Sequence, residues 1–291
     1  MTDVLIIGGG PAGVSAALYT ARAGMKTTIL YKDTGALTKA ELVDNFYASP
    51  GVTGAELVES GLAQAATLGI ELIKDEAVNI SVRPSDMYFI VETANTSYTS
   101  KTLVLATGAN RETPKIPGLT ALEGKGVSHC AVCDAFFYRN KNVAVLGHSQ
   151  YALSEAKVLL PLVKSLHVLT NGHEPDVIFP PQAVICKEKI NALQGDAKLT
   201  NAILGSDQKT IPLDGIFIAL GTAGATALAR KLGALTEDNA VIVDTNMRTN
   251  IPGLWAVGDC TPGMKQIAKA VYDGAVAGMD IVNSKKRWVT Q

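Results

Sequence analysis

The glycine turn near the N-terminus constrains the fold of this chain more than any other feature. Residues 4–7 form a short apolar run of the kind found in central parallel strands, and the turn that follows carries Gly8, Gly10 and Gly13 in a GxGxxG pattern. The first glycine allows a tight turn, the second lets the backbone approach a pyrophosphate, and the third lets the next helix pack on the strand. The pattern therefore predicts a dinucleotide-binding turn.

The residues around this turn complete a strand–turn–helix–strand unit. We expect a helix over residues 11–23, with Gly24 at its C-terminal end, and a strand over residues 27–31. In such units the second strand ends in an acidic residue that holds the ribose hydroxyls. Tyr31 stands at that position here and Asp33 follows it, so the ribose is expected on Asp33 or on backbone groups. Because the complete unit surrounds the glycines, a ligand-free turn is the weaker interpretation.

A second unit of the same kind starts near the middle of the chain. Residues 142–146 and 166–170 predict two parallel strands, and residues 150–160 predict the helix between them, stopped near Pro161. Gly147 opens the turn between the first strand and the helix. The two units predict an internal duplication, and hence two nucleotide-binding domains of one class.

The second turn has lost the features that hold a dinucleotide. Ser149 replaces the glycine that lets the backbone approach a phosphate, and the bulky His148 and Tyr151 flank it. The segment after the second strand has no Arg or Lys for the 2′-phosphate of NADP; the nearest basic residues are Lys164 and Lys187. Losing two or three charge-assisted hydrogen bonds weakens binding by roughly a thousandfold or more. We therefore expect neither NADPH nor NADH to be an efficient electron donor.

Later segments also place candidate residues at strand ends. Residues 103–108 and 254–257 each predict a buried strand that runs into a glycine, and Asp259 follows the second of these. Open α/β sheets bind ligands at the carboxyl ends of their strands, so Asp259 is a candidate binding residue. A helix is expected next, over residues 265–282.

The expected fold class is α/β, with two Rossmann-like, three-layer nucleotide-binding domains, the second inserted in the first. Residues 1–113 and 244–291 are expected to form the first domain and residues 114–243 the second. Residues 284–291 form a polar tail with one aromatic residue, Trp288. A frayed terminus is the expectation for this tail, and stacking of Trp288 over a cofactor or donor site is the alternative.

The cysteines point to redox chemistry. Cys130 and Cys133 are separated by two residues and followed by Asp134, and two thiols at this spacing can close into a disulfide and reopen. Four cysteines in 291 residues are too few for a secreted disulfide scaffold, and no second CxxC supports a zinc site. We expect a catalytic pair in a reducing cytoplasm and no metal. Cys186 is expected to be a small core residue, and Cys260, next to Asp259, is a candidate reactive thiol.

The overall composition excludes several other classes of function. A formal net charge of -1 and a pI near 6.4 do not suggest a nucleic-acid or anionic-membrane ligand. The chain has 47% hydrophobic and 18% charged residues, which is typical of a globular protein, and its length predicts about two domains. The N-terminus lacks the basic segment and cleavage site of a signal peptide, and no apolar run is long enough to span a bilayer.

The order of these motifs resembles the low-molecular-weight thioredoxin reductases over nearly the whole chain. The matching elements are the N-terminal GxGxxG, a segment that lines the flavin, an Ala-Thr-Gly at the exit of the first domain, the CxxCD, a C-terminal Gly-Asp, and a segment beside the flavin pyrimidine ring. The resemblance implies that FAD contacts Gly8, Gly10, Pro11, Ala12, Gly13, Asp33, Gly35, Ala36, Leu37, Asn45, Ala106, Thr107, Gly108, Gly258, Asp259, Gln266 and Ile267.

The resemblance also implies roles for the redox residues. Cys133 corresponds to the thiol next to the flavin, and Cys130 to the exchanging thiol that attacks the substrate disulfide. Asp134 corresponds to the acid–base group that protonates the leaving thiolate or activates a thiol. The alternative interpretation of Asp134 is a helix N-cap just after the cysteines. Thioredoxin or a thioredoxin-like protein is the implied partner, and a homodimer is the implied assembly.

The middle domain departs from the family pattern. Typical members carry GxGxxA there and a basic His-Arg-Arg segment after the strand, whereas here only Gly147 and Ala152 remain and the basic segment is absent. This is similar to the branch of the family that takes electrons from reduced ferredoxin. Two alternatives stay open: a conventional NADPH-dependent reductase whose nucleotide site uses other residues, and a flavin-bound redox sensor without turnover. The intact CxxCD favours an enzyme over the sensor.

Overall fold

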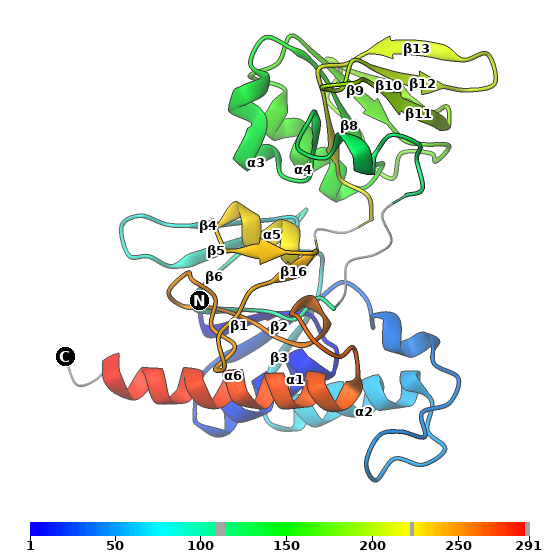
Figure 1. Cartoon of the computed structure of the whole chain (residues 1–291). Helices are drawn as coiled ribbons and strands as arrows, with labels where there is room; N and C mark the ends of the chain where they lie inside the picture. The colour runs from blue at the N-terminus through cyan, green and yellow to red at the C-terminus, as the bar shows by residue number, and fades with distance from the viewer. Residues whose placement is uncertain (109–113, 222–223, 289–291) are drawn as a thin grey trace. The chain divides into compact units, whose positions relative to one another are not determined.

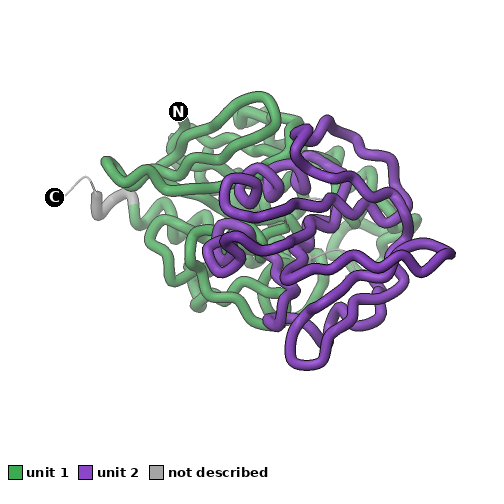
Figure 2. Tube along the Cα trace, turned by 90° about the horizontal axis from the view of Figure 1, so that it is seen from above, with its two compact units in different colours: residues 1–110, 224–291 green, residues 111–223 purple. Residues whose placement is uncertain are grey.

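The computed structural model describes residues 1–108, 114–221 and 224–288, the last four of them by backbone only. The chain divides into two compact units (Figure 2): unit 1 comprises residues 1–110 and 224–291, and unit 2 comprises residues 111–223. A middle segment is thus enclosed in sequence by the two parts of unit 1.

Unit 1 is built on a mixed sheet with the strand order β3-β2-β1-β6-β5-β4, and β17 also pairs with β6. The central pairings of β1 with β2 and β6, of β2 with β3, and of β17 with β6 are parallel, and β5 pairs antiparallel with β4 and β6. The strands are β1 (Thr2–Ile7), β2 (Thr27–Tyr31), β3 (Glu71–Lys74), β4 (Asn79–Val82), β5 (Phe89–Glu92), β6 (Ser97–Leu105) and β17 (Leu254–Ala256).

Three helices lie on one face of this sheet, as Figure 1 shows: α1 (Pro11–Arg22), α2 (Gly54–Thr67) and α6 (Ile267–Trp288). Helix α1 starts with a proline, which suits the first helical position because its missing N–H has no partner there. Helix α2 starts with a capping box in which Thr53 and Glu56 bond reciprocally to each other's backbone amides. The predicted strand–turn–helix–strand unit is confirmed, with the helix ending just before Gly24.

Residues 224–243 lie in unit 1, although the sequence placed them in the middle domain. They form α5 (Ala225–Lys231), β15 (Thr236–Glu237) and β16 (Ala240–Val241). The amide of Ala225 donates to Thr107 Oγ1 at 2.7 Å, and Lys231 Nζ donates to Asn79 Oδ1 on β4 at 3.1 Å. These long-range bonds attach the segment to unit 1, and neither partner was recognisable from sequence spacing.

Unit 2 contains the predicted second strand–turn–helix–strand unit. Its parallel sheet has the order β10-β9-β8-β14-β7, and a separate antiparallel sheet has the order β11-β12-β13. The strands are β7 (Val127–Ser128), β8 (Asn142–Leu146), β9 (Ser165–Leu169), β10 (Ala183–Cys186), β11 (Ile190–Gln194), β12 (Asn201–Leu204), β13 (Lys209–Pro212) and β14 (Gly215–Ile218). The helices are α3 (Ala131–Asp134) and α4 (Gln150–Leu159).

Short 3₁₀ turns occur in both units. They are η1 (Ala36–Lys39) and η4 (Gly258–Cys260) in unit 1, and η2 (Thr120–Leu122) and η3 (Ala135–Tyr138) in unit 2.

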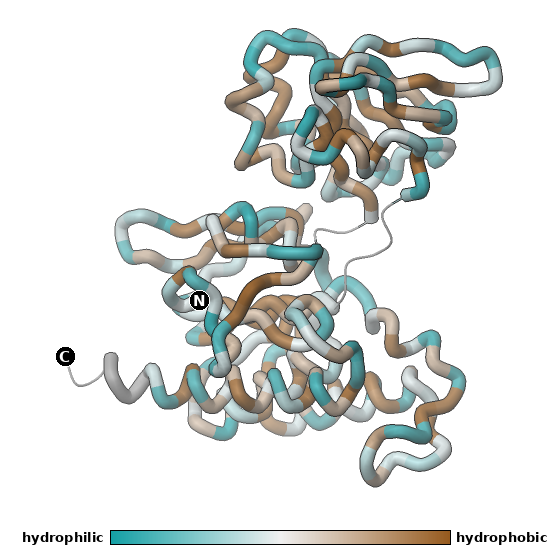
Figure 3. Tube along the Cα trace, viewed as in Figure 1, coloured by the Kyte–Doolittle hydropathy of each residue, from teal (hydrophilic) through white to brown (hydrophobic). Residues whose placement is uncertain are grey.

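Each unit has its own hydrophobic core. In unit 1, residues of β1, α1 and α6, among them Ile6, Ala16 and Ala277, pack together with no exposed surface. In unit 2, Ala144 and Leu146 of β8 pack with Cys186 and the residues of β11 to β14. Figure 3 shows these apolar stretches along the strands. Two separate cores, each with parallel strands joined by a helix (β1-α1-β2 and β8-α4-β9), confirm the α/β, Rossmann-type fold class.

The C-terminal helix is longer than the sequence suggested. Helix α6 continues to Trp288, so residues 284–288 are helical and the expected polar tail is wrong for them. Ser-Lys-Lys-Arg-Trp contains no helix breaker, and Lys and Arg are strong helix formers. The Trp288 side chain and residues 289–291 lie outside the described part of the structure. The predicted stacking of Trp288 therefore also falls outside it. None of the described helices is both long enough and apolar enough to span a membrane.

Candidate active site

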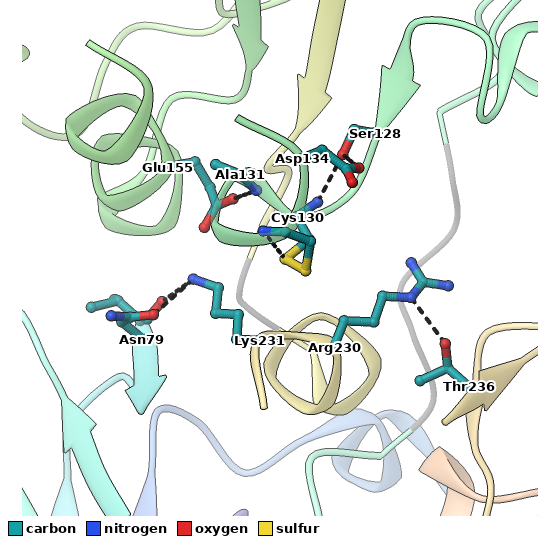
Figure 4. The surroundings of a disulfide bond; sticks show 11 residues. Asn79, Ser128, Cys130, Ala131, Asp134, Glu155, Arg230, Lys231 and Thr236 are labelled. Carbon is teal, nitrogen blue, oxygen red and sulfur yellow. Dashed lines mark hydrogen bonds between the residues drawn. A yellow bond between two sulfur atoms is a disulfide. The ribbon is translucent and has the colours of Figure 1, made fainter. Parts of the chain in front are cut away.

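The predicted redox pair is closed into a disulfide. Cys130 and Cys133 are bonded to each other at the start of α3 (Figure 4). Cys130 is the N-cap of this helix, and its Sγ accepts a hydrogen bond from the backbone amide of Cys133 at 3.2 Å. A donor directed at sulfur stabilises a thiolate more than a thiol, so this contact favours the anionic form of Cys130 once the disulfide opens.

The two sulfur-bearing residues differ in exposure. Cys130 is 3% exposed, whereas Cys133 is an exposed residue. The resemblance assigned the attack on the substrate disulfide to Cys130, which is the buried residue in this oxidised form. That assignment stays a prediction, and it requires Cys130 to become accessible during the reaction.

Asp134 is the last residue of α3, and its carboxylate turns back toward β7. Its Oδ2 accepts a hydrogen bond of 2.6 Å from the hydroxyl of Ser128. The N-cap interpretation of Asp134 holds for its position but not for its side chain. Asp134 does occupy the cap position of η3, but its side chain makes no capping hydrogen bond, because the carboxylate is held by Ser128 instead.

Two residues that the sequence analysis did not single out hold the backbone around the disulfide. Ser128 Oγ accepts a hydrogen bond from the amide of Cys130 at 3.2 Å. Glu155 of α4 is 1% exposed, and its Oε2 accepts a hydrogen bond from the amide of Ala131 at 2.7 Å. Glu155 stands 24 positions from Ala131 in the chain, so no local motif could have found it.

Tyr138 is the last residue of η3, the 3₁₀ turn that follows α3. Its ring stacks edge-on against Phe217 with centroids 5.2 Å apart. Burial raises the pKa of Tyr138, and the negative charges of Asp134 and Asp214 raise it further. The phenol therefore stays neutral at ordinary pH.

The first glycine turn is shaped as the sequence predicted. A methyl group on Gly13 would lie 2.0 Å from the carbonyl oxygen of Gly8, and one on Gly8 would lie 2.2 Å from that of Ala106. A methyl group on Gly10, in contrast, would meet no atom within 4 Å. Gly10 is the N-cap of α1, and no side chain caps the start of this helix. Such a helix start is suited to a phosphate.

Other predicted binding residues meet around this turn. A methyl group on Gly258 would lie 2.7 Å from Ala12 Cβ, which places the C-terminal Gly-Asp beside the start of α1. Asn45 Nδ2 donates to Gln266 Oε1 at 3.0 Å, although 221 positions separate them. Thr107 instead binds the start of α5, as described above. The structure thus brings Gly8, Gly13, Ala106, Ala12 and Gly258 together, and separately pairs Asn45 with Gln266.

The segment after β2 is organised by Asp33. Its Oδ1 accepts a hydrogen bond from the amide of Gly35 at 2.9 Å and so shapes the turn into η1, which contains Ala36 and Leu37. The amide of Gly54 at the start of α2 donates to Ala40 O at 2.8 Å, which fixes the end of η1. The predicted contact of Asp33 with a ribose stays a prediction.

Two lysines and a buried aspartate hold the Gly258 turn, and the sequence analysis missed all three. Lys269 Nζ donates to Gly258 O at 3.0 Å and to Asp273 Oδ2 at 2.6 Å. Asp273 is 2% exposed and also accepts from the amide of Gly258 at 3.0 Å. Lys265 Nζ donates to the carbonyl oxygen of Asp259 at 2.7 Å. Lys269 and Asp273 have the i,i+4 spacing of an ordinary ion pair on α6, and Lys265 precedes that helix, so only the turn that the three residues bind reveals their role.

The second glycine turn keeps its tight backbone, and the side chains around it make contacts within unit 2. A methyl group on Gly147 would lie 2.2 Å from Ala219 O, so the tight turn is retained. Ser149 is buried, and its hydroxyl donates to Gly221 O at 2.9 Å. His148 Nδ1 lies 3.0 Å from Asp176 Oδ2, and the His148 ring stacks on His173 with centroids 4.6 Å apart. The side chains around the second turn thus bond to the backbone and to one another.

The basic candidate Lys187 is already engaged in this unit. Its Nζ lies 2.5 Å from Glu174 Oε2, in an exposed ion pair. A lysine paired with a carboxylate offers less charge to a 2′-phosphate than a free one. This contact adds to the loss of the nucleotide-binding pattern.

The two remaining cysteines are buried. Cys186 lies in the core of unit 2, as predicted. Burial raises the pKa of Cys260 to about 12, and its Sγ lies 3.1 Å from Val257 O. The idea that Cys260 is a reactive thiol is therefore wrong, because only the thiolate reacts. Among the described residues, no group of three or more His, Cys, Asp or Glu side chains is placed to hold a metal ion.

The chain is similar to thioredoxin reductases in both sequence and structure. A family model described as pyridine nucleotide-disulphide oxidoreductase matches residues 2–180 and 183–274. The thioredoxin reductase of Aquifex aeolicus is 31% identical, over 99% of this chain and 96% of that protein. Similarity at this level over whole chains extends beyond the fold to the family.

Two solved structures bear on the branch within the family. The atypical thioredoxin reductase TRi from Desulfovibrio vulgaris Hildenborough is 34% identical, with a TM-score of 0.89 over 98% of this chain and 99% of that one. A ferredoxin-flavin thioredoxin reductase from Clostridium acetobutylicum is 30% identical, with a TM-score of 0.72 over 98% of each chain. The chain therefore belongs to the pyridine nucleotide-disulphide oxidoreductase family, and within it to the thioredoxin reductases, which are flavoprotein disulfide oxidoreductases.

Proposed function

We propose that this chain passes electrons from reduced ferredoxin, through FAD and the Cys130–Cys133 disulfide, to thioredoxin or a thioredoxin-like protein. The observation that carries the proposal is the second glycine turn, where Ser149 bonds to Gly221 O and His148 pairs with Asp176. A pyridine nucleotide needs an open turn and a cation for its 2′-phosphate. A one-electron protein donor needs neither, because it only has to approach the edge of the flavin.

The residues of unit 1 fit FAD. The space above Gly10 and the uncapped start of α1 suit the pyrophosphate, and Pro11, Ala12 and Gly13 shape that start. The neighbouring strands β6 and β17 are followed by Ala106, Thr107 and Gly108 and by Gly258 and Asp259, at the strand ends where α/β sheets bind ligands. We further propose that Asn45, Gln266 and Ile267 contact the flavin ring system. A bound flavin supplies electron transfer between a one-electron donor and a two-electron disulfide.

The chain's own residues then carry out thiol–disulfide exchange. Asp134 takes the proton of the Cys130 thiol, and the thiolate attacks the partner disulfide; one partner sulfur leaves as a thiolate and receives that proton. Cys133, deprotonated in the same way, attacks the Cys130 sulfur, and the second partner sulfur leaves and is protonated. Two electrons pass to the partner, which ends as a dithiol, and the Cys130–Cys133 disulfide is restored.

The surface next to the disulfide supports a protein partner. Val132, Phe136 and Phe137 are 49%, 70% and 68% exposed. Exposed aromatic side chains of this kind are enriched in protein interfaces and are unusual on an isolated surface. Their position directly beside Cys133 favours a protein disulfide over a small one.

The deciding experiment is anaerobic bleaching of the flavin absorbance. The oxidised protein is mixed with excess NADPH, with excess NADH, and with reduced ferredoxin. We expect bleaching by ferredoxin alone. Fast bleaching by NADPH would instead make the chain a conventional thioredoxin reductase.

Disulfide turnover separates the enzyme from a redox sensor. With dithionite as artificial donor, the protein is expected to reduce oxidised thioredoxin, and Cys130→Ser and Cys133→Ser are each expected to abolish this turnover. A flavin-containing protein that does not reduce any disulfide under these conditions would favour the sensor. The homodimer and the cytoplasmic location stay predictions from the resemblance and the cysteine usage.

A further inference from the structure

We propose that Ser128 is a positioning residue for the proton transfers of the Cys130–Cys133 pair. The inference rests on the proposed function, because it takes Asp134 as the acid–base group of the exchange reaction. Ser128 is the last residue of β7 and is 5% exposed. It belongs to none of the sequence motifs that pointed to the active site.

One hydroxyl group links the carboxylate to the disulfide loop. Ser128 Oγ donates to Asp134 Oδ2 at 2.6 Å and accepts from the amide of Cys130 at 3.2 Å. Because the second contact uses an N–H as its donor, the hydroxyl proton is directed to the carboxylate. In the oxidised form Asp134 is therefore held as a hydrogen-bond acceptor, the role that an ionised carboxylate fills.

The two ends of this link differ in how firmly the backbone holds them. In β7, Val127 pairs with Ile216 and Ser128 pairs with Phe217 on β14, a strand that is buried throughout. Asp134 ends α3, which spans only four residues, and a single helical turn is marginal by itself. A side chain on a sheet strand thus orients the side chain of a less constrained segment, as a supporting residue should.

A hydroxyl group suits both protonation states of Asp134. It donates to the carboxylate, and after Asp134 takes a proton from a thiol the same oxygen can accept from the acid. A backbone amide in this place would serve only the ionised form. Ser128 therefore keeps the carboxyl group oriented while the proton arrives from the thiol and leaves for the departing thiolate. Ser128 itself exchanges no proton and forms no covalent bond.

The test measures the exchange step directly, without depending on the electron donor. The flavin-loaded protein is reduced anaerobically with dithionite and mixed with an excess of a chromogenic aromatic disulfide, and thiolate release is followed as a function of pH. We expect Asp134→Asn to slow release about a hundredfold, and Ser128→Ala to slow it about tenfold. Ser128→Ala also moves the acidic limb of the pH profile to higher pH, because an ionised carboxylate without its donor is less stable.

Two further variants separate positioning from a general structural effect. Ser128→Thr keeps the hydroxyl and restores the rate and the pH profile. In the double variant Ser128→Ala with Asp134→Asn, release is no slower than in Asp134→Asn alone, because Ser128 acts through Asp134. Ser165→Ala is the matched control: Ser165 Oγ donates to Asn142 Oδ1 at 2.8 Å between β9 and β8 of the same sheet, and its loss leaves the profile unchanged.

The outcomes distinguish this inference from the proposed function. If Asp134→Asn releases thiolate at the full rate, the acid–base role in the proposed function is wrong. A second outcome is that Asp134→Asn slows thiolate release, and that adding Ser128→Ala to Asp134→Asn slows it further by the same factor as Ser128→Ala alone. That outcome overturns only the positioning role of Ser128. An unchanged pH profile in Ser128→Ala overturns it as well. Flavin absorbance and thermal unfolding confirm that each variant is folded.

Discussion

The two glycine turns of this chain share a backbone and differ in what lies above it. In both turns, a methyl group on the first glycine would collide with a carbonyl oxygen at the end of a neighbouring strand. For Gly8 this is Ala106 O, and for Gly147 it is Ala219 O, each at 2.2 Å. The tight turn is therefore kept twice. Above Gly10 the space is open, whereas Ser149 at the equivalent place points its hydroxyl at Gly221 O.

This difference shows that, within one motif, the glycine needed for the tight turn can be kept while the glycine that leaves room for a ligand is replaced. Gly147 is needed because the strand and helix pass too close for a side chain, and the sheet would be distorted without it. The residue at the position of Ser149 has no such constraint, so it can change without disturbing the turn. His148 contacts Asp176 and His173 beside it.

The largest expected effect comes from the glycines that the fold itself needs. Gly13→Ala places a methyl group 2.0 Å from Gly8 O. Backbone atoms cannot move aside cheaply, so we expect a loss of about 3 kcal/mol in unfolding free energy, together with loss of the flavin. Gly147→Ala is the matched change in unit 2 and should cost a similar amount of stability while the flavin is retained. Thermal unfolding measures the stability of each variant, and the flavin-to-protein absorbance ratio measures its flavin content. If both variants fold and lose the same amount of flavin, the expected difference between the two turns is contradicted.

Gly10→Ala tests the open space without disturbing the fold. Because its methyl group would touch no protein atom within 4 Å, we expect unchanged thermal stability. The same group would enter the proposed pyrophosphate site and remove one or two charge-assisted hydrogen bonds, weakening flavin binding by roughly ten- to a hundredfold. Titration of the apoprotein with FAD gives the dissociation constant. Ser149→Ala is the control in the second turn, and a comparable loss of FAD affinity there would show that unit 2 contributes to the flavin site.

Ser149→Gly tests how much the side chain of Ser149 alone contributes to the weak reaction with NADPH that we expect. Removing the side chain restores the glycine but leaves the 2′-phosphate of NADPH without a cation. We therefore expect the rate of flavin bleaching by NADPH to rise by less than about tenfold. Rapid-mixing absorbance with NADPH and NADH measures it. A rise of about a hundredfold would mean that Ser149 by itself had closed a site that is otherwise intact.

The smallest effect concerns the lone thiols, one in each unit. The pKa of Cys260 is raised to about 12, so its thiol stays protonated and unreactive near pH 8, and burial also raises the pKa of Cys186. After reduction, native protein should be alkylated at Cys130 and Cys133 only, and urea-unfolded protein at all four cysteines. Mass spectrometry counts the labels. Labelling of Cys260 in the native protein would show that the turn after β17 opens.

Much of the architecture was predictable because it depends on local patterns. The apolar runs and glycines of both units placed β1, α1, β2, β8, α4 and β9 to within one or two residues, since hydrophobic periodicity and turn residues act over short distances. The disulfide was predictable from the two-residue spacing of Cys130 and Cys133. The separate antiparallel sheet of β11 to β13 and the assignment of residues 224–243 to unit 1 were not, because they depend on pairings between distant segments.

Residue type and spacing along the chain were enough to predict the fold class, the redox pair and the absence of the second nucleotide pattern. The tertiary structure decided which side chains act together. Ser128 meets Asp134, Glu155 meets the amide of Ala131, and Lys269 meets Gly258 only after the sheets and helices have assembled. A hydrogen bond depends on distance and direction in space, and neither is recorded in the separation of two residues along a chain.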